Sequence, residues 1–152
     1  HNMVFPVRTC IAAAKGGLET LKYVREVGGA PWHVDVCASA AREGDLEVLQ
    51  WARQNGCPWN VSTFASAAAN GDLEMMKWLK KEGCPWDASV CAASRRVRVL
   101  RWLREKGCPW DKRTPKSLIF LQHKAYAVTL FALRNGCPCP LGLLNKIKKK
   151  KE

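Results

Sequence analysis

Eight cysteines and three histidines are the residues of this 152-residue chain whose types could bind a metal or form disulfides. Four cysteines recur between a glycine and a proline: Cys57, Cys84, Cys108 and Cys137. If they mark successive layers of packed helices, those layers lie ~8–10 Å apart. A disulfide needs Cα atoms within about 7 Å, and zinc needs ligands ~2.3 Å from one centre. Equivalent cysteines in successive layers therefore do not pair.

The remaining cysteines favour packing over chemistry. Cys10, Cys37 and Cys91 stand 27 or 54 residues apart, and Phe64 takes the same place between them. Because a phenyl ring substitutes for a thiol there, we expect small buried hydrophobes in a reducing, intracellular compartment, not a secreted protein. Cys137 and Cys139 alone are neighbours, and such a pair is weak evidence for a metal site. We predict no metal and no cofactor.

Acid–base catalysis has little support in the sequence. His1, His33 and His123 have no nucleophile and carboxylate near them in the sequence, and phosphate-loop, zincin and nucleophile-elbow motifs are absent. Three glutamates recur at predicted helix starts, where they complement the helix dipole: Glu19, Glu47 and Glu74. We therefore predict that the chain is not an enzyme.

A repeated unit organises the chain. Trp32, Trp59, Trp86 and Trp110 each follow a proline, at spacings of 27, 27 and 24 residues. Such periods indicate a stacked solenoid. The predicted units are residues 5–31, 32–58, 59–85, 86–109 and 110–139, followed by a basic tail at 140–152. We expect the tryptophans after the prolines to pack over the groove between repeats, with base stacking as the alternative.

Each unit reads as helix, turn, helix. Residues 62–70 begin with Ser-Thr, which can cap a helix, and end at Gly71. Residues 72–83 carry an apolar stripe that includes Leu73, Met76 and Leu79, and Pro85 prevents continuation. Strand signals are absent, so the predicted class is all-α.

The unit "STFASAAANGDLEMMKWLKKEGCPWD" resembles an ankyrin repeat. Ser62 stands at the family's threonine, Ala67 and Ala68 at its paired alanines, and Gly71 and Gly83 at its two glycines. The resemblance covers about residues 5–139 and implies an all-α, helix-turn-helix repeat solenoid of about five repeats. The family period is 33 residues, and the shorter period here leaves no room after Gly83 for the family's β-hairpin fingers.

Charge separates the two ends of the chain. Residues 1–86 hold nine basic and nine acidic residues, whereas residues 87–152 hold sixteen basic and four acidic ones, a net of +12. In the fourth unit Arg96 and Arg98 replace acids such as Asp45 and Glu47, although positive charge opposes the dipole at a helix start. The excess therefore indicates an anionic partner, with a solvated face as the alternative.

The predicted cationic patch gathers the basic side chains around the fourth unit and the tail. On the helix, Arg98, Arg101 and Arg104 share one polar face, opposite a buried face of Val99, Leu100, Trp102 and Leu103. The whole patch is Arg95, Arg96, Arg98, Arg101, Arg104, Lys106, Lys112, Arg113, Lys116, Lys146, Lys148, Lys149, Lys150 and Lys151.

A second anomaly is the predicted last helix, residues 125–136, which is apolar nearly all round. A terminal repeat normally has a polar outer face. The apolar face either docks another subunit or is covered by the tail. The residues of this docking or self-capping face are Ala127, Leu130 and Leu133 on the helix, with Leu141, Leu143 and Leu144 as the tail residues that would cover it.

Two functions follow from these features. The first is a non-enzymatic scaffold whose basic end docks on an acidic protein in a larger assembly. The second is an RNA- or DNA-associated protein, RNA before DNA, using the arginine face and lysine tail against phosphates. No run of apolar residues is long enough for a transmembrane segment, and we do not expect an anionic membrane surface to be the partner.

Overall fold

The computed structural model describes residues 5–110 and 131–137. Within these ranges the chain is helical and has no strand, which confirms the predicted all-α class. It divides into two compact units, His1–Trp86 (unit 1) and Asp87–Glu152 (unit 2). The boundary between them coincides with the change from neutral to basic sequence. The predicted division at residue 139 stays a prediction, since residues 138–152 lie outside the described ranges.

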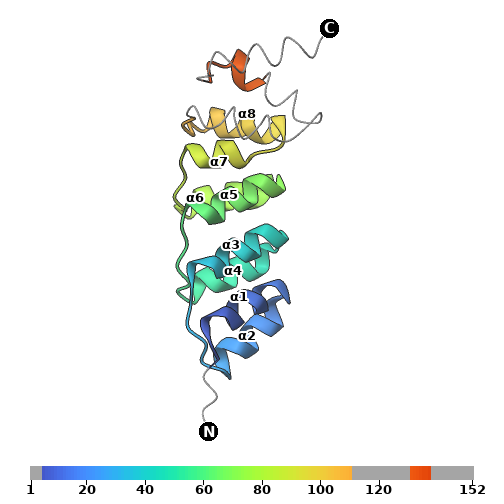
Figure 1. Ribbon diagram of the computed structural model, residues 1–152, viewed down its shortest axis with the longest axis vertical. Helices are drawn as coiled ribbons and strands as arrows, with labels where there is room; N and C mark the ends of the chain where they lie inside the picture. Colours follow the sequence, from blue (N-terminus) through green and yellow to red (C-terminus); the bar gives the residue numbers. More distant parts are fainter. Residues whose placement is uncertain (1–4, 111–130, 138–152) are drawn as a thin grey trace. The chain divides into compact units, whose positions relative to one another are not determined.

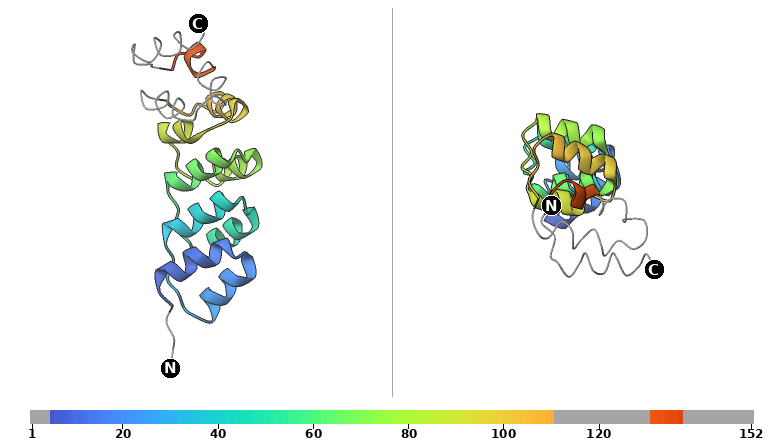
Figure 2. Two further views of the ribbon diagram at one scale, coloured as in Figure 1. Left: turned by 45° about the vertical axis from the view of Figure 1, so that its right-hand side comes forward. Right: turned by 90° about the horizontal axis from the view of Figure 1, so that it is seen from above.

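Unit 1 consists of three helix pairs (Figure 1). The pairs are α1 (Val7–Lys15) with α2 (Leu18–Glu26), α3 (Val34–Glu43) with α4 (Leu46–Gln54), and α5 (Val61–Asn70) with α6 (Leu73–Lys81). Within each pair the two helices contact each other, and successive first helices contact along the stack, α1 with α3 and α3 with α5. The turned view in Figure 2 shows the same pairs layered one on another. This is the predicted helix-turn-helix repeat solenoid.

The core of unit 1 lies between the helices of each pair and between successive layers. Its largest fully buried side chains include Leu21, Leu49, Met76 and Leu79 from the second helices and Phe64 from a first helix. Small side chains dominate the first helices, as in the buried run Cys37, Ala38, Ser39, Ala40 and Ala41. Small residues let neighbouring backbones approach closely, which explains why the first helices form the contact line of the stack.

Helix starts and ends follow the repeat. Asp45 and Asp72 are N-caps of α4 and α6, and their carboxylates accept hydrogen bonds from the amides of Val48 and Met75, both at 3.0 Å. The interpretation of Ser62 as a cap of α5 was wrong: Asn60 is the cap, and its side chain accepts from the Ser62 amide at 2.9 Å. The helix begins one residue earlier than predicted because the asparagine before Val61 supplies the oxygen first.

Unit 2 contains α7 (Ala88–Ala93) and α8 (Val97–Glu105), and residues 131–134 are also helical. The spacing of 24 residues between Trp86 and Trp110, three fewer than in the preceding repeats, has a clear structural cause. The N-cap Arg96 follows the N-cap Asp87 by nine positions, whereas Asp72 follows Asn60 by twelve. The deletion therefore shortens the first helix to six residues and removes the glycine that ends it in the left-handed conformation, as Gly71 does with φ 80°.

The cysteine that follows each second helix forms a hydrogen bond with the start of the first helix of the same repeat. The Cys57 thiol donates to the His33 carbonyl at 3.5 Å, and the Cys108 thiol donates to the Asp87 carbonyl at the same distance. His33 and Asp87 are the N-caps of α3 and α7. The thiol thus sits at the place where the two ends of one repeat meet.

None of the helices that the structure describes is both long and apolar enough to pass through a membrane.

Candidate partner-binding surface

The exposed arginines gather at the start and along one side of α8. Arg95, Arg96, Arg98 and Arg101 are exposed, whereas Val99, Leu100 and Leu103 are fully buried. The helix therefore has the predicted buried and polar faces, although Trp102 is only half-buried. Lys106 is exposed at the C-terminal end of α8, where positive charge is favoured by the helix dipole.

Arg96 stands at the N-cap of α8, a position where an aspartate stabilises the start of α4 and of α6. It is the N-cap of α8, and its side chain makes no capping hydrogen bond, unlike Asp45 and Asp72 at the same position. The first turn of α8 also lacks the acidic residue found in α4 and α6. A missing cap typically costs about 1 kcal/mol, so stability of α8 does not account for the arginine.

Arg104 differs from its neighbours because it holds the turn that follows α8. Its guanidinium donates to the Cys108 carbonyl at 2.7 Å and lies 4.4 Å from the centre of the Trp110 ring. The side chain is half-buried. Arg101 lies 5.9 Å from the Phe131 ring. Arg104 is thus primarily a structural residue, and the exposed arginines of this surface are Arg95, Arg96, Arg98 and Arg101.

The contact of Arg104 is a feature of the repeat that the sequence analysis missed. Arg25, Arg53 and Lys80 lie over Trp32, Trp59 and Trp86 at 4.2, 3.9 and 3.9 Å from the ring centres. Arg25 and Arg53 also donate to the carbonyls of Ala30 and Cys57. The signal is present in the sequence, since a basic residue stands six or seven positions before each tryptophan that follows a proline.

The tryptophans after the prolines pack between repeats, as predicted. Trp32 meets Trp51 edge to face with ring centres 6.0 Å apart, and its Nε1 donates to the Asn55 carbonyl at 2.8 Å. Trp59 meets Trp78 in the same way at 5.8 Å. These contacts within the chain cover part of each ring, which disfavours the stacking of a large nucleic-acid base as the main role of these tryptophans.

The described thiols are buried, and the pKa of four of them lies above its ordinary value, whereas the hydrogen bond with Cys91 lowers the pKa of Cys108. Burial raises the pKa of Cys84 to about 12, and burial also raises the pKa of Cys10. The neighbouring Cys37 raises the pKa of Cys57, and Cys108 raises that of Cys91. The sequence analysis missed these neighbours, because it compared equivalent positions in different layers and not two positions of one repeat. Within the described residues, no group of three metal-ligating side chains is close enough to hold an ion.

Several predicted site residues lie outside the described residues. They are Lys112, Arg113, Lys116, Lys146, Lys148, Lys149, Lys150 and Lys151 of the patch, and Ala127, Leu130, Leu141, Leu143 and Leu144 of the apolar face. Leu133 alone of the apolar face is described, and it is half-buried.

Comparison with known proteins agrees with the fold. Residues 34–79, which span α3 to α6, match the family model of ankyrin repeats in many copies. A search of curated proteins finds no match. Ankyrin repeats stack into extended surfaces that bind other proteins and are typically non-catalytic. The helix pairs, the glycine-ended first helices α3 and α5 and this match identify residues 34–79 of the chain as ankyrin repeats.

Proposed function

We propose that this chain is a non-enzymatic interaction module whose basic unit 2 docks on an acidic partner protein within a larger assembly. The observation that carries the proposal is the exposed arginine row at the start and along one side of α8. Arg95, Arg96, Arg98 and Arg101 all belong to it.

The arginines occupy positions where the other repeats carry residues that stabilise the helix. An N-cap aspartate and a first-turn glutamate serve α4 and α6, and both are arginine at the corresponding places of α8. Because the exchange lowers the stability of α8, a compensating interaction outside the helix is the simplest physical reason for it.

The charge balance supports an anionic partner over a neutral one. Unit 1 has no net charge, and unit 2 carries +12. Arginine forms bidentate hydrogen bonds with carboxylates and phosphates. Since ankyrin repeats bind proteins, carboxylate-rich protein is the first choice, and nucleic acid is the alternative that the lysine tail favours.

The proposal includes a reducing, intracellular compartment. Cys10, Cys37, Cys57, Cys84, Cys91 and Cys108 are all buried thiols rather than disulfides. Cysteine-rich chains in oxidising compartments normally carry disulfides.

The test compares two anionic probes on the full chain. A fluorescent decapeptide of alternating Glu and Asp represents an acidic protein, and a labelled RNA hairpin and a matched DNA duplex represent nucleic acid. Affinities are measured by anisotropy over a salt series. The triple variant Arg95→Gln, Arg98→Gln, Arg101→Gln removes charge but keeps the length of the side chains, and Arg104 stays in place to hold the turn.

The matched control neutralises three exposed basic residues of unit 1: Arg8→Gln, Arg42→Gln and Lys81→Gln. We expect the acidic peptide to bind and the unit 2 triple variant to lose roughly tenfold or more in affinity, with the unit 1 variant unchanged. Equal affinity for both triple variants would exclude the arginine row. Tighter binding to RNA, with a log–log salt slope of several units, would replace the acidic protein with nucleic acid as partner.

A further inference from the structure

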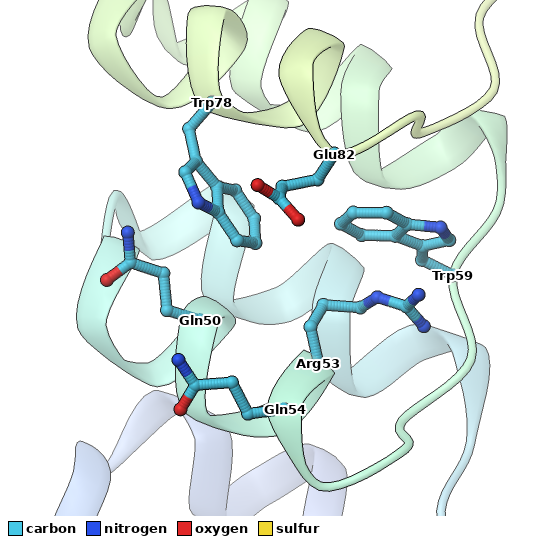
Figure 3. A pocket seen from close by; sticks show the side chains of 6 residues that line it. All are labelled: Gln50, Arg53, Gln54, Trp59, Trp78 and Glu82. Atoms are coloured by element: carbon cyan, nitrogen blue, oxygen red, sulfur yellow. The ribbon is translucent and has the colours of Figure 1, made fainter.

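A hollow of about 310 Å³ opens between the second helices of the two later repeats in unit 1 (Figure 3). Gln50, Arg53 and Gln54 of α4 line one side, and Trp78 of α6 with Glu82 at its end lines the other. Trp59 closes it from the connection between the repeats. Gln54 and Glu82 are exposed, so the hollow is accessible from solvent.

Two indole rings form its apolar walls. The Trp59 and Trp78 ring centres are 5.8 Å apart, and the ring planes meet at 73°. The Arg53 guanidinium lies 3.9 Å from the centre of the Trp59 ring, and its Nη1 donates to the Cys57 carbonyl at 2.5 Å. The chain therefore already places one cation on this aromatic pair, and that cation is held by the turn.

Three polar side chains that can accept hydrogen bonds also line the hollow. The Glu82 carboxylate points toward the two indole rings from the end of α6, and the Gln50 and Gln54 side chains, one helical turn apart on α4, line the opposite side (Figure 3). Within the described part of the chain, none of these three side chains forms a hydrogen bond or an ion pair. A carboxylate and two amide oxygens can together accept several hydrogen bonds, which matches a ligand rich in donors.

The combination is particular to this repeat. At the position of Glu82 the other units carry Val27, Asn55 and Lys106, and at the position of Gln50 they carry Lys22, Lys77 and Arg101. Glu82 thus places an acid where those units carry a neutral or basic residue, and Gln50 is uncharged where they carry lysine or arginine.

We propose that this hollow binds the arginine side chain of a partner's peptide segment. A guanidinium is planar and can stack on an indole face while its edge donates two hydrogen bonds to a carboxylate. Its remaining donors can reach the amide oxygens of Gln50 and Gln54. Lysine offers a point charge without the planar stacking, so it fits less well. The site lies in unit 1 and is independent of the basic surface of α8.

The test uses the full chain and three short peptides with the sequence acetyl-Gly-X-Gly-amide, where X is arginine, lysine or citrulline. Citrulline keeps the shape of arginine but has no charge. Two-dimensional NMR of ¹⁵N-labelled protein reports on the indole N–H groups of Trp59 and Trp78, and titration gives the affinities. We expect the arginine peptide to shift both indole signals and to bind roughly tenfold tighter than the citrulline peptide.

Three variants decide the role of the hollow. Glu82→Gln should lower the affinity for the arginine peptide roughly tenfold, because it removes the carboxylate charge. Gln54→Lys should also lower this affinity, because it adds a positive charge beside the bound guanidinium. Lys81 stands at the equivalent position of the next repeat, which shows that the fold accepts lysine there. Glu43→Gln, at an exposed carboxylate on α3, should bind as the unmodified chain does.

Either of two results would overturn the proposal. One is equal affinity of the arginine peptide for the Glu82→Gln and Glu43→Gln variants. The other is an arginine titration that leaves the Trp59 and Trp78 signals unmoved. Circular dichroism melting curves of each variant establish that the fold is intact, as expected for exposed side chains.

Discussion

Arg53 at the end of one repeat forms a cation–π contact with Trp59 at the start of the next, and we call this arrangement the clasp. The guanidinium lies 3.9 Å from the ring centre and donates to the carbonyl of Cys57, two residues before the tryptophan. The same arrangement joins Arg104 to Trp110, and Lys80 supplies the cation over Trp86. The clasp explains why a cation precedes each of these tryptophans.

Replacing Arg53 with alanine should destabilise the chain by about 2 kcal/mol, since it removes a charged hydrogen bond and a cation–π contact. Arg53→Lys should lose less, because Lys80 performs the same contact in the next repeat. Urea unfolding followed by circular dichroism measures both. Arg42→Ala serves as an exposed control expected to stay within about 0.5 kcal/mol. An alanine variant as stable as that control would show that the clasp contributes nothing.

The helix caps predict opposite effects in the two units. Asp72→Ala should destabilise the chain by about 1 kcal/mol, because the Met75 amide loses its acceptor. Arg96→Asp should stabilise it by about the same amount, since it introduces the cap that α8 lacks. Thermal melting compares both with Asp72→Asn, which keeps an acceptor. Loss of stability in Arg96→Asp would mean that the arginine already stabilises α8.

The hydroxyl of Thr63 is fully buried and has no hydrogen-bond partner among the described residues. Val36 and Val90 occupy the equivalent positions of α3 and α7. Thr63→Val should therefore stabilise the chain by about 1 kcal/mol, because it removes a buried polar group at constant shape. The free energy of unfolding in urea is the measurement. A less stable valine variant would reveal a partner for the hydroxyl.

The raised pKa of Cys84 predicts a loss of stability at high pH. Above about pH 9 the thiol ionises in the unfolded chain, whereas in the folded chain burial holds its pKa at about 12. The unfolded state then binds fewer protons, so stability falls as pH rises, by about 1.4 kcal/mol per pH unit for this thiol.

Cys84→Ala isolates that contribution, and alanine is already present at the equivalent position as Ala30. Unfolding free energies between pH 8 and 10.5 should fall less steeply for the variant than for the unmodified chain. Parallel curves would show that the thiol ionises equally well in the folded state.

Much of the repeat could be predicted from spacing alone. Recurring Trp32, Trp59 and Trp86, with glycines such as Gly71 at helix ends, predicted the helix pairs that unit 1 contains. These features depend on local chemistry, since proline prevents helix and glycine tolerates positive φ. The cap of α5 was misassigned because Asn60 and Ser62 are both good caps and only the backbone path selects between them.

The sequence by itself determined which residues recur and which side of α8 is charged, because periodicity maps directly onto the faces of a helix. Only the tertiary structure decided which basic side chains form hydrogen bonds and ring contacts within the chain. Arg101 and Arg104 are alike in sequence, yet Arg101 is exposed and lies 5.9 Å from the Phe131 ring, whereas Arg104 donates to a carbonyl and lies closer to a ring that the turn brings back toward it. The hollow beside Glu82 likewise arises from side chains of two repeats. Its shape depends on how successive layers pack, which is a long-range property that no single repeat contains.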